Sequence, residues 1–173
     1  MENKIMSHVI KGLIIALIGI VVSIVGYFAK IDQQGWFKWV GTVITVAGII
    51  WACVHYANQL DGRVTFGNIF AHGFKTTAVI TIITLVYVVL AFTILFPEMK
   101  DRALDMARQE MEKNDKLSEA DIEQGVKMTK KLFFPFAIGG VILGTLIIGA
   151  IASLIGAAVA KKKPVSPLDQ LPS

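Results

Sequence analysis

The sequence has only one cysteine, Cys53, among its 173 residues. A disulfide within the chain and a metal site built from cysteines both require more than one, so both are excluded. The sequence also lacks the glycine-rich phosphate loops, the HExxH zinc pattern and the GxSxG nucleophile elbow. No serine, histidine and acidic residue stand at a spacing that supports a catalytic set. We therefore predict neither an enzyme nor a cofactor.

Charged residues are scarce and unevenly placed. They make up 17% of the chain, against about 25% in a typical soluble domain. Nine of the thirteen Asp and Glu and eight of the seventeen Lys and Arg lie in residues 98–131. Lys161, Lys162 and Lys163 directly follow an apolar run. Lysines in that place are typical of an anchor in the lipid headgroups, whereas nucleic acid is bound by basic patches on a soluble face, so we predict no nucleic-acid partner.

Long apolar runs fill most of the remaining sequence. Crossing about 30 Å of hydrocarbon takes roughly 20 apolar residues in a helix. Four runs are long enough, and so short a chain could not cover them all with a polar shell. The sequence therefore predicts an all-α integral membrane protein, a single domain over residues 1–173 that lies in the lipid bilayer. The predicted transmembrane helices are residues 12–29, 39–57, 76–96 and 132–160.

The first run is expected to be a retained transmembrane helix, because it is longer than the apolar core of a signal peptide. Eleven Leu, Ile, Val or Phe between Leu13 and Phe28 each favour insertion by roughly 0.3–0.6 kcal/mol. Lys11 and Lys30 flank the run. We expect both side chains to extend their ammonium groups to the membrane surface.

Aromatic residues mark the expected membrane surfaces, where their amphipathic rings prefer to lie. Trp36 and Trp39 open the second run. Residues 65–75 carry three phenylalanines on one helical face, after Thr65 as a candidate N-cap. We predict a short amphipathic helix that leads into the third span, with this face either in the acyl boundary or packed on the bundle. The three phenylalanines are Phe66, Phe70 and Phe74.

Residues 98–131 are predicted to form a charged helical hairpin outside the membrane, between the third and fourth spans. Its first arm carries an apolar stripe with three methionines. Asn114 and Asp115 break the pattern, and Ser118 with Asp121 resembles the capping box that starts a helix. Two interpretations stay open, a solvated connector and a surface that docks a partner through adaptable methionines. The methionines are Met99, Met106 and Met111.

Small residues indicate how the helices pack. Lipid supplies no hydrophobic drive between helices, so association depends on close approach of their backbones. The fourth span is rich in small residues, and Pro135 falls in its expected first turn, where the missing N–H costs little. The small residues could hold a four-helix bundle within one chain or mediate self-association. The packing candidates are Gly140, Gly144, Gly149, Ser153 and Gly156.

One histidine lies inside a predicted span. His55 stands near the end of the second run, and an ionisable group within a membrane is a first indication of function. A site formed with Asp61 and His72, on the same side of the membrane, could relay protons or hold a metal. The alternative is an interfacial histidine that binds backbone or headgroups.

The four spans place both termini and the 58–75 loop on one side of the membrane. Lys4 and Lys11 precede the first helix, which usually sets the orientation, so we expect cytoplasmic termini. The charged 98–131 segment places more Lys and Arg on the other side and conflicts with this expectation. Beyond the last span, residues 161–173 are expected to be a disordered, basic, proline-containing tail.

Several segments together resemble a bacterial membrane family. TFGNIFAHGFK at residues 65–75 is similar to the SFGxAFxxGF entry to that family's third span. Phe96-Pro97, the run QEMEKNDKLSEADIEQGVKMTKKLFFP and a glycine-rich last span ending in lysines also match. The chain thus resembles the domain-of-unknown-function 4199 family, common in Bacteroidota. The resemblance implies a four-helix inner-membrane protein without a known activity, and Phe96 replaces the aspartate expected before the proline.

Two functions fit these observations. Association surfaces without catalytic chemistry favour an accessory, scaffold or partner-binding subunit of a bacterial inner-membrane complex. The alternative is a small transporter or channel whose pathway forms only in an oligomer, through the small residues of the fourth span.

Overall fold

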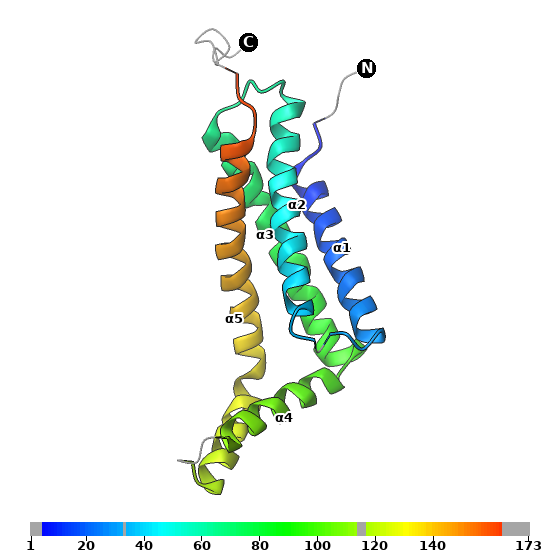
Figure 1. The fold of residues 1–173 in the computed structure, drawn as a ribbon, viewed down its shortest axis with the longest axis vertical. Helices are drawn as coiled ribbons and strands as arrows, with labels where there is room; N and C mark the ends of the chain where they lie inside the picture. Colours follow the sequence, from blue (N-terminus) through cyan, green and yellow to red (C-terminus); the bar gives the residue numbers. More distant parts are fainter. Residues whose placement is uncertain (1–4, 33, 114–116, 164–173) are drawn as a thin grey trace. The chain divides into compact units, whose positions relative to one another are not determined.

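The computed structural model describes residues 5–32, 34–113 and 117–163 (Figure 1). Helices, turns and short connections account for all of these residues, and no strand occurs among them. The predicted all-α class is therefore confirmed. The expected break at Asn114 and Asp115, and residues 164–173 of the expected tail, lie outside the described residues.

Four helices are long and apolar enough to cross a membrane, which confirms the predicted number of candidate spans. They are α1 (His8–Phe28), α2 (Phe37–Gln59), α3 (Phe66–Leu90) and α5 (Glu119–Val159). A π-helical turn, η1 (Ala91–Leu95), extends α3, and the charged helix α4 (Glu98–Glu112) follows it.

The chain divides into two compact units. Unit 1 is Met1–Thr84 with Leu143–Ser173, and unit 2 is Leu85–Ile142. Unit 1 therefore contains α1, α2, most of α3 and the C-terminal part of α5. Unit 2 contains the end of α3, η1, α4 and the N-terminal part of α5.

Small side chains fill much of the interior of unit 1, and large apolar side chains cover its outside. Ala52, Cys53 and Ala157 are completely buried, whereas Val21 and Phe28 are mostly exposed. This distribution suits a bundle in lipid, where small residues let backbones approach and large apolar residues lose nothing by facing outward.

Buried hydroxyl groups in unit 1 are satisfied within their own helices. Thr76 and Thr77 donate to the carbonyls of His72 and Gly73, at 2.9 and 3.1 Å. Ser153 donates to the carbonyl of Gly149 at 2.6 Å. A hydroxyl bonded to the carbonyl four residues earlier needs no partner on another helix, so these residues can lie in tight helix contacts.

Helix α3 begins earlier than the predicted third span. Thr65 is the N-cap that we expected, because its Oγ1 accepts a hydrogen bond from the Asn68 N–H at 3.2 Å. From Phe66 the helix runs without a break, so the amphipathic segment is the start of α3 and the expectation of a separate short helix is wrong. Ile69 is buried in the core of unit 1, and Phe66 is exposed.

Helix α5 is a single helix of 41 residues. The capping box at its start is confirmed, because the Asp121 N–H donates to Ser118 Oγ at 3.3 Å and the Ser118 N–H donates to the Asp121 carboxylate at 3.0 Å. Pro135 lies in the helix interior and not in a first turn, which corrects our prediction. No residue ends the helix between its charged and apolar parts. A proline removes one backbone hydrogen bond, and membrane helices tolerate this loss.

The charged hairpin predicted at 98–131 is not confirmed as a separate element, because its second arm is continuous with the fourth apolar helix. Within unit 2, α4 and the start of α5 do lie close together. A Cβ atom built at Gly125 would lie 2.8 Å from the Met111 Sδ atom. Met111 therefore takes part in packing within the chain.

Candidate functional site

Lys11 is completely buried in unit 1, so the prediction that its ammonium group extends outward from the helices is wrong. The capping residue Ser7 explains the difference. Its Oγ accepts a hydrogen bond from the Ile10 N–H at 3.3 Å, and α1 therefore starts at His8, before the lysine. Lys11 thus lies in the first turn of the helix on the side that faces the bundle.

Three acceptors surround the Lys11 ammonium group. Its Nζ atom lies 3.3 Å from the Ala52 carbonyl oxygen and 3.4 Å from Gln59 Oε1, both on α2. It lies 3.2 Å from the Nε2 atom of His72 on α3. A lysine ammonium has three N–H donors, so the acceptors match the donors in number. None of the ion pairs between described residues involves Lys11.

The contact with Lys11 fixes the tautomer of His72. An ammonium group can only donate, so His72 Nε2 accepts and the neutral imidazole carries its hydrogen on Nδ1. The ring of Tyr56 stacks on the His72 ring with 4.0 Å between centroids, and the Lys11 Nζ atom is 5.6 Å from the Tyr56 centroid. The ring of His8 meets the His72 ring edge to face, with 6.0 Å between their centroids.

Helical spacing explains why the cluster forms. Ala52, Tyr56 and Gln59 are four and three residues apart, so they share one face of α2. On α3, His72 and Thr76 share a face for the same reason, and both are buried. Sequence reasoning missed Lys11, Tyr56 and Gln59, although the lysine next to an apolar run and the shared α2 face were visible signals.

A hollow of about 420 Å³ lies beside this cluster in unit 1. Its apolar wall consists of Ile5, Met6 and Ala71. The rest of the wall is polar, comes from α1, α2 and α3, and contains no acidic residue among the described residues. The polar wall residues are Ser7, His8, Tyr56, Asn68, His72 and Lys75.

The possible metal or proton-relay site of His55, Asp61 and His72 does not form. The His55 ring stacks on Trp51 at 5.3 Å, and its buried Nδ1 atom has no hydrogen-bond partner in the described part of the chain. Over residues 5–32, 34–113 and 117–163, no three His, Cys, Asp or Glu are grouped as metal ligands. The Cys53 thiol donates to the Ile69 carbonyl at 3.7 Å.

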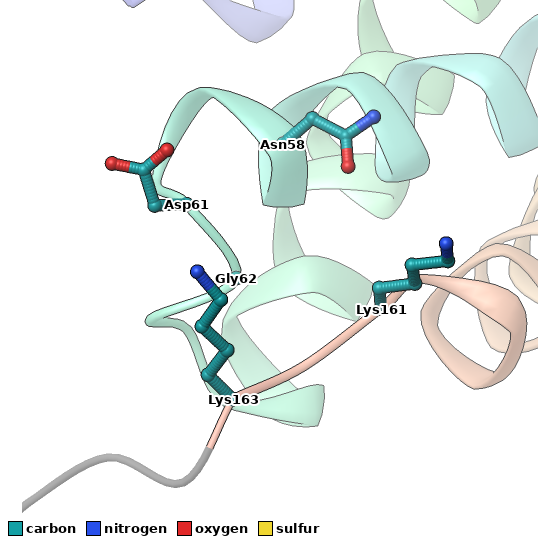
Figure 2. A pocket seen from close by; sticks show the side chains of 5 residues that line it. All are labelled: Asn58, Asp61, Gly62, Lys161 and Lys163. Carbon is teal, nitrogen blue, oxygen red and sulfur yellow. The ribbon is translucent and has the colours of Figure 1, made fainter.

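Asp61 belongs to a second, smaller hollow of about 230 Å³ at the loop between α2 and α3 (Figure 2). Gly62 in this loop has a φ of +77°, which favours glycine. Its carbonyl accepts a hydrogen bond from the Lys163 N–H at 2.9 Å, which attaches the segment after α5 to the loop. Asn58, Lys161 and Lys163 complete the wall.

One lysine of the basic triplet helps to end α5. Lys162 Nζ donates to the Ala157 carbonyl at 2.7 Å and lies 5.1 Å from the centroid of the Phe66 ring. A cation near the C-terminus of a helix satisfies unpaired carbonyls and interacts well with the helix dipole. Anchoring in lipid headgroups stays a prediction for the triplet.

The packing candidates on α5 lie in different surroundings. A Cβ atom added to Gly149 would collide with Thr77, and one added to Gly156 would lie 2.7 Å from Cys53 Cβ. Ser153 is also completely buried. By contrast, apart from its own neighbours along the helix, nothing among the described residues lies within 4 Å of a Cβ atom built at Gly140 or Gly144. Their role in association between chains stays a prediction.

The predicted interfacial and docking residues differ in exposure. Trp36, Trp39, Phe66 and Phe74 are exposed, and Phe70 is half-buried with its ring 6.0 Å from that of Phe74. On α4, Met106 is 57% exposed, while Met99 and Met111 are half-buried. Membrane contact and partner docking by these residues stay predictions.

Comparison with known proteins assigns a family. No curated protein and no solved structure matches the chain. The model of the family described as "Protein of unknown function (DUF4199)" matches residues 11–162, which is most of the chain and includes all four apolar helices in whole or in part. The resemblance noted in the sequence is thereby confirmed, and the chain belongs to the DUF4199 family of proteins of unknown function.

Proposed function

We propose that this protein acts by binding, as an accessory or scaffold subunit of a bacterial inner-membrane complex. The fully buried Lys11 is the observation that supports this proposal. An ionisable group inside a membrane bundle is costly and is by default a functional feature. The groups around it donate or accept hydrogen bonds, and the nearby Cys53 thiol is directed to a carbonyl oxygen. This chemistry suits recognition and coupling of helices better than group transfer.

The proposed orientation has both termini in the cytoplasm. Because Lys11 is buried, it no longer counts among the basic residues at the membrane surface. The orientation is then supported by Lys4 before α1 and by Arg63 and Lys75 around the start of α3. The lysine triplet after α5 adds to the same side.

The partner is proposed to dock on α4. Of the three methionines in its stripe, Met106 is the exposed one, whereas Met111 packs near Gly125. A flexible thioether on an exposed helix face suits adaptable protein contacts. Met106 is therefore the position to test, because changing Met111 would also disturb packing within unit 2.

The first prediction concerns partner recovery from native membranes after cross-linking, with the tagged chain and mass spectrometry. The wild type should recover one dominant partner in a fixed ratio. Met106→Gln should weaken this recovery, because it makes the docking face polar. Lys11→Met should weaken it too, because it removes the bonds that join α1 to α2 and α3. Lys30→Met, at an exposed lysine after the same helix, is the matched control.

Thermal unfolding in detergent separates lost binding from lost folding in these variants. If Lys11→Met and Met106→Gln recover as much of the partner as the wild type does, the proposed roles of both residues are rejected. Recovery of the chain alone, at a fixed multiple, would reject the accessory function and favour a homo-oligomer.

A transporter or channel that forms only in an oligomer is the second candidate. The surroundings of Gly144 on α5 favour this candidate, because no other helix among the described residues packs against this glycine. Gly149 cannot serve the same purpose, since Thr77 of the same unit already lies against it. Of the two glycines, Gly144 is thus the one available for contact with a second copy.

The second prediction tests that candidate. If copies associate through α5, Gly144→Leu should convert a defined oligomer in mild detergent to a monomer without lowering the melting temperature, because leucine would block close backbone approach. Gly139→Leu, at another uncrowded glycine of α5, is the control and should leave the oligomer intact. Size-exclusion chromatography with light scattering gives the mass, and a strictly monomeric wild type would exclude this function.

A further inference from the structure

The hollow beside the Lys11 cluster is rich in hydrogen-bond donors. Ser7 and His8 come from the start of α1, Tyr56 from α2, and Asn68, His72 and Lys75 from α3. A hydroxyl, a phenol, an amide and an ammonium group can all donate to an anion. Because these residues come from three helices, one guest could bridge all three helices.

The wall also contains a donor from a largely buried ring. His72 is only 8% exposed, and its Nε2 atom lies 3.2 Å from the Lys11 Nζ atom. With Nε2 accepting from the ammonium group, the ring hydrogen is on Nδ1, and this N–H can donate to a guest.

The charges around the hollow favour an anion. Lys75 is in the wall, and the Lys11 ammonium group lies directly behind His72. The wall also contains the N-cap of α1, where the positive end of the helix dipole adds to the field. No described wall residue is acidic, so nothing in the described part of the wall neutralises these charges.

Size and geometry narrow the class of anion. The volume of about 420 Å³ is within the usual range of small-ligand sites. A carboxylate presents two oxygens in one plane, whereas a phosphate presents its oxygens in different directions. The donors here come from three helices, an origin that suits the second arrangement better than the first. We propose that this hollow binds a phosphate group, carried by an anionic lipid headgroup or by a soluble molecule.

The test uses the full-length chain in nanodiscs and measures its melting temperature. In zwitterionic phosphatidylcholine discs, added inorganic phosphate should raise the melting temperature if the source is soluble, because a ligand that binds only the folded state stabilises it. If the source is a headgroup, phosphatidylglycerol in the disc should stabilise the chain and free phosphate should not. Sodium acetate at equal ionic strength controls for carboxylate and salt effects.

Variants at the rim of the hollow identify the site. Lys75→Gln should weaken the apparent affinity about tenfold, because it removes one charge-assisted hydrogen bond. Asn68→Leu should weaken it by a smaller factor, because the lost amide donor is neutral. Arg63→Gln also removes an exposed positive charge, but Arg63 lies outside the hollow, so this control should bind as the wild type does.

Stabilisation by inorganic phosphate or by phosphatidylglycerol that is lost in Lys75→Gln and kept in Arg63→Gln would support the site. An equal response to acetate, an equal response of all variants, or no response to either phosphate source would overturn it. The proposal is independent of the accessory function. If the chain binds phosphate but recovers no partner, the phosphate site is supported and the accessory function is rejected. If it recovers a partner but does not bind phosphate, the accessory function is supported and the phosphate site is rejected.

Discussion

Gly73→Ala is expected to lower the free energy of unfolding by about 2 kcal/mol, although alanine is the better helix former. Gly73 lies where α3 meets α2 and α5. A Cβ atom there would collide with the Cys53 Sγ atom and lie 2.7 Å from Ser153 Oγ. Neither neighbour can move freely, because the thiol donates to the Ile69 carbonyl and the hydroxyl to the Gly149 carbonyl. The added methyl group must therefore separate the helices.

Gly67→Ala is the matched control for this substitution, because it makes the same chemical change on the same helix. Apart from its own neighbours along the helix, nothing among the described residues lies within 4 Å of a Cβ atom built at Gly67. Unfolding by SDS in mixed micelles should show this variant as stable as the wild type, or more stable by up to about 1 kcal/mol. Equal stability of Gly73→Ala and Gly67→Ala would show that the three-helix contact does not limit packing.

The helical class and the number of candidate membrane spans could be predicted because lipid imposes a local rule. Every backbone group in the membrane must find its hydrogen bond within the segment, so an apolar run of sufficient length is helical whatever surrounds it. The N-caps at Thr65 and Ser118 are equally local, since each bonds to a residue three positions later. Such features need no knowledge of the tertiary structure.

The candidate site could not be predicted in this way, because its contacts are distant in the sequence. Lys11 stands beside an apolar run, and local reasoning therefore assigned it to the membrane surface. Its acceptors on Ala52, Gln59 and His72 are 41, 48 and 61 residues away. Only the packing of α1 against α2 and α3 brings them together. His72 was considered, but with His55 and Asp61, which lie in other surroundings.

The continuity of α3 and α5 was missed for a different reason. Changes of polarity at residues 75 and 132 suggested boundaries, yet polarity determines where a helix meets water and not where it ends. Helices end where a residue or a cap stops them. The polar entry to α3 therefore belongs to the same rigid helix as the span. This continuity places His72, Asn68 and Lys75 on one helix beside the Lys11 cluster.

Lys11→Ala is expected to lower the free energy of unfolding by about 3 kcal/mol, more than Gly73→Ala does. Alanine leaves a cavity in place of the long side chain and removes the donor from Gln59 Oε1 and His72 Nε2, which lie in the bundle. The Ala52 carbonyl loses its side-chain donor as well. Unfolding in mixed micelles measures the loss.

Lys11→Met separates the two causes of that loss. Methionine fills most of the space and avoids burying a charge, so about 1 kcal/mol should be lost, mainly from the acceptors left without a donor. If Lys11→Ala is as stable as Lys11→Met, the cavity costs nothing, which would mean that neighbouring side chains move in and fill it. A wild type no more stable than the alanine variant would mean that the cost of burying the ammonium group cancels the gain from its three hydrogen bonds. Lys11 would then be retained for its charge at the site, independently of the stability of the bundle.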